Sequence, residues 1–197
     1  FGNHESEISA ARQGLSLADV SSRGKLVVEG ITSEEIVDVT FGGPTLDVGS
    51  GSSVKDIHVY RLRTDLYYVS TFPGEEDATH NLLTEAALRQ SELVTITDIT
   101  HGRAELCMIG SESAELLSRL CGIDFRSASF PNLTARQSSV AKTSQIIVRQ
   151  DIGDLPAFSV IGARSLGEYL WDTIMKAGQD LNIRPLGHRA LADMDAI

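Results

Sequence analysis

The feature that most constrains this chain is an internal repeat of a strand-like segment closed by a glycine. The first copy reads D-V-S-S-R-G-K-L-V-V-E-G from Asp19 to Gly30, and the second reads D-I-T-H-G-R-A-E-L-C-M-I-G from Asp98 to Gly110. A hydroxyl-bearing, acidic stretch typical of a helix start follows each copy. The pattern predicts that each half runs strand, helix, strand, strand, helix, strand, which is the order of a ferredoxin-like β-α-β-β-α-β unit.

The predicted fold class is therefore α+β, with a duplicated ferredoxin-like unit. The 197 residues suit one domain, and we expect it to consist of two pseudo-repeats at about residues 10–97 and 98–191. Within them the sequence predicts a strand over Gly24–Gly30, a helix over Ser113–Leu120 and a flexible loop over Gly49–Ser53.

Charge and cysteine usage exclude several classes of function. A formal net charge of -10 disfavours nucleic acid and anionic membrane surfaces, which attract basic proteins. No apolar run approaches the ~20 residues of a membrane-spanning helix. Cys107 and Cys121 lack the spacing of a zinc or disulfide framework, so a reducing cytoplasm is expected. The five histidines are scattered, and no metal site is predicted.

The stretch Val54–Thr71 reads as a β-hairpin, with β-branched and aromatic residues on either side of a short polar turn. Asp56 lies near the start of its first strand, where carboxylates are depleted. Two interpretations stay open. Asp56 is either a solvated residue paired with Lys55 or Arg61, or a carboxylate that points into a pocket.

Several segments resemble one family. The run from Ala10 to Gly30 is similar to the opening of the folate-binding domain of glycine cleavage T-protein, an aminomethyltransferase, and V-K-D-I-H-V-Y-R-L resembles its I-D-D-L-I-V-Y segment. R-P-L-G-H-R-A-L, from Arg184, resembles its P-x-G-L-x-A-R-D segment. R-S-L-G-E-Y-L-W, from Arg164, resembles a segment of the gamma subunit of heterotetrameric sarcosine oxidase, which is a single-domain form.

The resemblance implies four site residues. The functional carboxylate of the family falls on Asp56, which becomes the predicted catalytic and cofactor-binding residue, and Tyr60 is predicted to bind the cofactor beside it. The family's R-T-G-Y-T-G-E-x-G segment falls on R-Q-D-I-G-D-L-P-A-F. Arg149 aligns there, and Asp154 stands in for the Glu that bonds the pterin edge. A plain β-turn at Gly153–Asp154 explains the same residues.

The implied function is tetrahydrofolate binding with uptake of one-carbon units from an N-methyl or aminomethyl donor. The chain would act as an aminomethyltransferase-like protein or as a subunit of a sarcosine oxidase or demethylase complex, with flavin-containing subunits as partners. The alternative is a non-catalytic relative that serves as an assembly or small-molecule-binding module.

Overall fold

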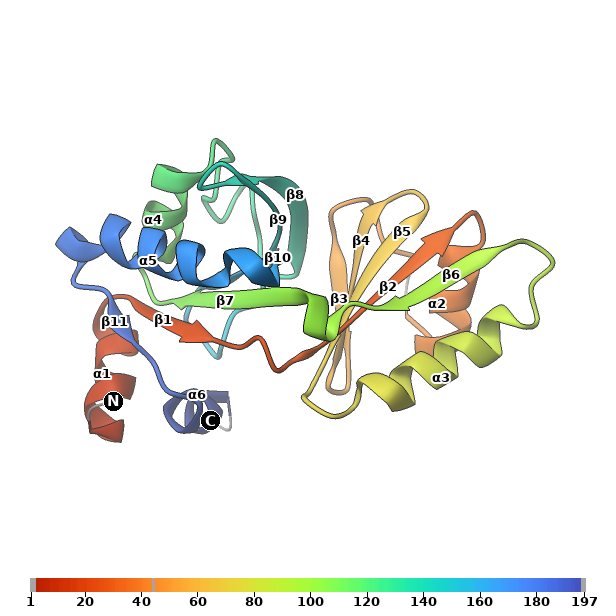
Figure 1. Ribbon diagram of the computed structural model, residues 1–197, viewed down its shortest axis with the longest axis horizontal. Helices are drawn as coiled ribbons and strands as arrows, with labels where there is room; N and C mark the ends of the chain where they lie inside the picture. Colours follow the sequence, from red (N-terminus) through yellow and green to blue (C-terminus); the bar gives the residue numbers. More distant parts are fainter. Residues whose placement is uncertain (1–2, 44, 196–197) are drawn as a thin grey trace. The chain divides into compact units, whose positions relative to one another are not determined.

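The computed structural model describes residues 3–43 and 45–195, which form two sheets flanked by helices (Figure 1). The chain divides into two compact units. Unit 1 contains the residues up to Ser21, Arg103–Asn132 and the residues from Arg136 onward. Unit 2 contains Ser22–Gly102 and Leu133–Ala135. Unit 1 is therefore discontinuous in sequence, while the boundaries of the two pseudo-repeats stay a prediction.

Unit 2 contains one five-stranded sheet and two helices. Its elements are β2 (Gly24–Gly30), α2 (Ser33–Phe41), β3 (Gly51–Val54), β4 (Ile57–Arg63), β5 (Leu66–Thr71), α3 (Glu76–Ala87) and β6 (Val94–Asp98). The strand order is β3-β4-β5-β2-β6, with antiparallel neighbours. Leaving β3 aside, the four strands have the order of a ferredoxin-like unit. Inward residues such as Leu26, Val28, Ile36 and Leu83 form the core between sheet and helices.

Unit 1 carries helices on both faces of a six-stranded sheet. Its elements are α1 (His4–Gln13), β1 (Ser16–Asp19), β7 (Arg103–Ile109), α4 (Ser113–Leu120), β8 (Thr134–Val140, shared with unit 2), β9 (Thr143–Arg149), β10 (Ala157–Ala163), α5 (Gly167–Ala177), β11 (Arg184–Pro185) and α6 (His188–Asp195). Strand β7 shows the alternation: Leu106 and Met108 join the core that contains α4 and α5 residues, and Cys107 and Ile109 join the core that contains α1 and α6 residues.

The sheet of unit 1 differs from that of unit 2 at one edge. Its order is β11-β1-β7-β10-β9-β8. The N-terminal strand β1 pairs with β7 where the last strand of a ferredoxin-like unit would lie. Strand β11, which follows α5, pairs in parallel with the outer side of β1. The duplicated α+β fold is thus present, with an extra strand inserted in one unit.

The structure confirms several predicted elements, corrects one and adds one that was not predicted. The strand Gly24–Gly30, the helix Ser113–Leu120 and the hairpin β4–β5 are confirmed. The expected flexible loop at Gly49–Ser53 is wrong, because Gly51 begins β3 and pairs with Tyr60. A Cβ at Gly51 would overlap the Tyr60 ring, so glycine is what lets the two strands approach. Strand β8 was not predicted from its polar sequence.

Candidate functional site

Asp56 lies at the tip of the turn that joins β3 to β4. Strand β4 begins at Ile57, so Asp56 lies near the start of that strand, as expected, but in the turn that precedes it. Lys55 has a left-handed backbone (φ 54°), which suits a tight two-residue hairpin turn. Both residues are exposed. Strands β3 and β4 pair along their length, from Gly51 opposite Tyr60 to Val54 opposite Ile57, so the two ends of this turn are held in place.

His58 is the titratable side chain whose electrostatic environment includes Asp56. Burial, followed by the nearby charge of Arg23, lowers the pKa of His58 from 6.5 to about 4, although Asp56 acts in the opposite direction. At neutral pH the imidazole is therefore uncharged. Because His58 supplies no positive charge there, it does not neutralise the Asp56 carboxylate.

The exposure of Asp56 agrees with the interpretation of a solvated carboxylate, but Arg61 is not its partner. Its guanidinium donates to Glu34 Oε2 at 2.8 Å, to the Leu46 carbonyl at 2.8 Å and to the Thr64 carbonyl at 3.0 Å. It also lies 5.5 Å from the centre of the Tyr67 ring. Arg61 therefore ties α2 and two loops to the hairpin.

Tyr60 is on the same hairpin as Asp56 but is fully buried. Its ring stacks on Tyr68 with the centroids 6.3 Å apart. A direct contact with a cofactor would need the Tyr60 ring to be uncovered, so its binding role stays a prediction.

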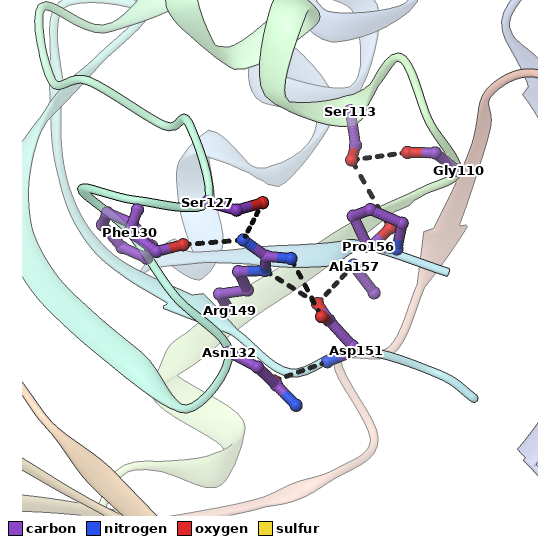
Figure 2. Close-up of polar contacts among 9 residues, drawn as sticks. All are labelled: Gly110, Ser113, Ser127, Phe130, Asn132, Arg149, Asp151, Pro156 and Ala157. Carbon is purple, nitrogen blue, oxygen red and sulfur yellow. Dashed lines mark hydrogen bonds and ion pairs between the residues drawn. The ribbon is translucent and has the colours of Figure 1, made fainter. Parts of the chain in front are cut away.

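Arg149 is the centre of a buried polar network at the end of β9 (Figure 2). Its Nε and Nη2 donate to the two carboxylate oxygens of Asp151 at 2.8 and 2.9 Å. Its Nη1 donates to the Phe130 carbonyl at 2.7 Å and to Ser127 Oγ at 3.0 Å. The guanidinium also lies 5.4 Å from the centre of the Phe158 ring.

Asp151 links this network to the turn that follows. Its backbone N–H donates to Asn132 Oδ1 at 2.9 Å, and its carboxylate accepts from the Ala157 N–H at 3.3 Å (Figure 2). Arg149 therefore orders the β9–β10 connection through Asp151. The sequence singled out Arg149 and missed Asp151, although an Arg and an acid two residues apart could have indicated the pair.

Asp154 is exposed at the tip of that connection, in a turn closed by mutual backbone bonds between Ile152 and Leu155 at 3.0 Å. It lines a small pocket of about 190 Å³. The other lining residues are Arg12, Ile152, Gly153, Leu155 and Met194. The pocket thus combines an apolar floor with one acidic and one basic side chain. Arg12 and Met194 come from α1 and α6, which no local motif could link to Asp154.

A second pocket in unit 1, of about 490 Å³, lies beside the end of α1. Its polar lining includes Gln13, Glu112, Asn182 and Arg184, together with Asp180. Arg119 donates to Asp180 at 2.6 Å, which holds the pKa of that carboxyl below its usual value. Sequence reasoning did not identify this pocket, because its residues come from three separate stretches of the chain.

The predicted residues thus fall into two pairs. Asp56 and Tyr60 share the β3–β4 hairpin of unit 2, and Arg149 and Asp154 share the β9–β10 connection of unit 1. Over residues 3–43 and 45–195 no group of three or more His, Cys, Asp or Glu side chains is arranged to hold a metal ion. Within the same ranges, no helix has the length and apolar character to cross a bilayer.

Comparison with known proteins gives a family match over almost the whole chain. Residues 1–195 match the model of the GCVT N-terminal domain. An aminomethyltransferase of Desulforamulus reducens is 23% identical over 193 residues, covering 92% of this chain and 52% of that protein. The sarcosine oxidase subunit alpha of Corynebacterium sp. strain P-1 is 25% identical over 201 residues, covering 92% and 20%. The chain therefore spans between a fifth and about half of these curated relatives.

Two solved structures share the fold. The glycine cleavage system aminomethyltransferase T from Bartonella henselae superposes with a TM-score of 0.82 at 15% identity, over 98% of this chain and 53% of that one. A chain of heterotetrameric sarcosine oxidase from Corynebacterium sp. U-96, in complex with pyrrole 2-carboxylate, gives a TM-score of 0.75 at 19% identity, over 90% and 92%.

Proposed function

Because this chain belongs to the GCVT N-terminal domain family, we propose that it binds tetrahydrofolate and takes up one-carbon units from an N-methyl or aminomethyl donor. It would do so as an aminomethyltransferase-like protein or as a subunit of a sarcosine oxidase-type complex, with flavin-containing subunits as partners. The observation that carries the proposal is the family match over residues 1–195, together with an exposed carboxylate, Asp56, on a paired hairpin.

The chemistry proposed for Asp56 is electrostatic and acid–base. A folate nitrogen that attacks the iminium carbon of a one-carbon donor forms a C–N bond while the C=N π pair moves to the donor nitrogen. The folate nitrogen, now positively charged, then loses its proton, and the donor leaves as a free amine when its own C–N bond breaks. An anion beside that nitrogen stabilises the positive charge and can accept the proton. Asp56 suits this role because its carboxylate is exposed and the neighbouring imidazole of His58 is uncharged at neutral pH.

Recognition of a pterin ring by the β9–β10 connection of unit 1 is a separate part of the proposal, which follows from the resemblance and is tested independently of Asp56. Pterin presents N–H donors, which a carboxylate accepts well. Asp154 lines a pocket with the apolar side chains of Ile152 and Leu155, a lining that fits a flat heterocycle with a polar edge. Arg149 has a positioning role in this proposal, because its bidentate partner Asp151 fixes the start of the turn.

One observation favours the second candidate, a non-catalytic assembly or small-molecule-binding module. The guanidinium of Arg149 is buried and bonded to Asp151, Phe130 and Ser127. Because these bonds are all made within the protein, Arg149 can serve the stability of the fold without contacting a ligand.

Calorimetric titration and a transfer assay separate the two candidates. Titration of the chain with tetrahydrofolate or folinic acid should give a micromolar dissociation constant, equivalent to about -8 kcal/mol. Asp56→Ala should change that constant little but slow one-carbon transfer by about 100-fold or more. Glu85→Gln, which changes an exposed carboxylate in the last turn of α3, should change neither quantity.

The two results that oppose the proposal differ. Absence of heat at saturating ligand, in the chain alone and in its purified complex, would contradict folate binding. Normal binding with transfer unaffected by Asp56→Ala would contradict the role of Asp56 only.

A further inference from the structure

Strand β6 forms one edge of the sheet in unit 2. It pairs with β2 on one side, and in the described part of the chain no strand pairs with its other side. Its sequence, V-T-I-T-D, contains neither Pro nor Lys, and its register with β2 is regular over all five residues. An edge of this kind is a ready template for another strand, since proteins that avoid such pairing place Pro, Lys or a bulge there.

The register shows which backbone groups face outward. The Ile99 N–H donates to the Lys25 carbonyl at 2.9 Å, and the register continues through the pairs of Thr97 with Val27 and Thr95 with Glu29. Hydrogen-bonded pairs alternate with non-bonded pairs in an antiparallel ladder. Thr95 and Thr97 therefore bond to β2, while Val94, Ile96 and Asp98 direct their N–H and C=O groups away from it.

Helix α3 lies over β2 and β6 and presents a second feature. Leu83 is fully buried in the core that includes β2 residues and Ile96, whereas its neighbour Leu82 is 53% exposed. Glu75, Leu82 and Arg89 are spaced by seven residues, and the two charged ones are also exposed. Glu75 is the N-cap residue and Arg89 follows the C-cap residue Leu88, and both cap residues keep a right-handed helical backbone. Seven residues are about two helical turns, so this spacing brings Glu75 and Arg89 to the flank of α3 that carries Leu82.

We propose that this edge pairs with β6 of a second copy of the chain, antiparallel and centred on Ile96. Ile96 would exchange two backbone bonds with its own copy, and Val94 would exchange two with Asp98 of the partner subunit. Thr95 would lie across from the partner's Thr97, a favourable cross-strand pair.

The expected distance between the two α3 helices favours a second copy of this chain as the partner of β6, rather than a strand from another protein. Neighbouring strands are about 4.8 Å apart, so helices above the β2–β6 gap of each copy would lie about 10 Å apart, the distance at which helices pack. Helix α3 has 12 residues and β6 has 5, which gives both a length of about 17–18 Å. A two-fold axis through Ile96 would therefore bring the middle of α3, where Leu82 lies, close to the partner's α3.

The charges on the α3 flank are self-complementary about this axis. Leu82 would pack on the partner's Leu82, and Glu75 would face the partner's Arg89 at both ends. The positive and negative charges of the proposed interface therefore cancel, although each chain has a net charge of -10. This inference is independent of the proposed folate site.

Sedimentation equilibrium of the whole chain over a wide concentration range tests the proposal. We expect a monomer–dimer equilibrium that Leu82→Glu weakens by about 100-fold or more, because two like charges would meet on the axis. Asn81→Glu, on the outward face of the same helix, is the matched control and should leave the equilibrium almost unchanged. Glu75→Lys should weaken the dimer, and Glu75→Lys combined with Arg89→Glu should restore it.

Val94→Pro checks the backbone ladder separately. It removes an outward N–H without removing a bond to β2, and proline is tolerated at the first residue of an edge strand. Circular dichroism would verify that each variant is folded. A chain that stays monomeric at every concentration would overturn the proposal, and so would a dimer that folded Leu82→Glu and Val94→Pro variants both retain.

Discussion

Replacing Arg149 by Met tests whether the network at the end of β9 stabilises unit 1. The change keeps a long apolar stem but removes the bidentate pair with Asp151 and the bonds to Phe130 and Ser127. The Arg149 and Asp151 side chains are 7% and 16% exposed, so a carboxylate would be left in a largely buried place. Losing one partner of such a pair costs about 3–5 kcal/mol, a large part of the stability of an ordinary domain.

Urea unfolding followed by tryptophan fluorescence measures this loss. The single tryptophan, Trp171, packs against the core of unit 1, so its signal reports on that unit. Arg126→Met is the matched control, because Arg126 also binds both oxygens of an aspartate, Asp124, but is 85% exposed. The control should leave the unfolding midpoint almost unchanged. Equal shifts for the two variants, or a loss under about 1 kcal/mol for Arg149→Met, would refute the reasoning.

Three further predictions concern unit 2. Burial and Arg23 lower the pKa of His58 from 6.5 to about 4 in the folded chain. As the pH falls, His58 is therefore protonated in the unfolded chain before it is protonated in the folded one, and about 3 kcal/mol of folding stability should be lost between pH 6.5 and 4. Unfolding measured as a function of pH should show a smaller loss for His58→Gln. Gly51→Ala should cost about 1–3 kcal/mol through overlap with the Tyr60 ring, while Gly102→Ala, which meets open space, should cost little. Burial raises the pKa of Tyr67 to about 12, so stability should fall between pH 10 and 12, and Tyr67→Phe should remove that loss.

The parts of the fold that follow from local pattern could be predicted. The strand Gly24–Gly30 is apolar and closed by glycines, and the helix Ser113–Leu120 places Leu116 and Leu117 in the core. Strand β8 could not be predicted from its sequence, T-A-R-Q-S-S-V, because five of its seven residues are polar and apolar residues do not alternate with them. Its strand conformation depends on pairing within the sheet.

The candidate site was accessible to sequence reasoning only in part. Asp56 was singled out by its position near a strand and by the resemblance, and its site role stays a prediction. Its turn could not be placed because β3 was interpreted as a loop. Asp154 was found through the resemblance, whereas Arg12 and Met194 reach its pocket from the two ends of the chain. The insertion of β1 beside β7 is likewise a non-local pairing, and no periodicity within Leu15–Val20 indicates it.

Titration of the isotopically labelled chain with folinic acid, followed by amide chemical shifts, tests the central claim most directly. If the hairpin carrying Asp56 meets the folate, saturable shifts should appear at residues 53–58, and Asp56→Ala should alter them while leaving the dissociation constant nearly the same. Saturation without any shift at residues 53–58, or no shifts anywhere at millimolar ligand, would contradict the account.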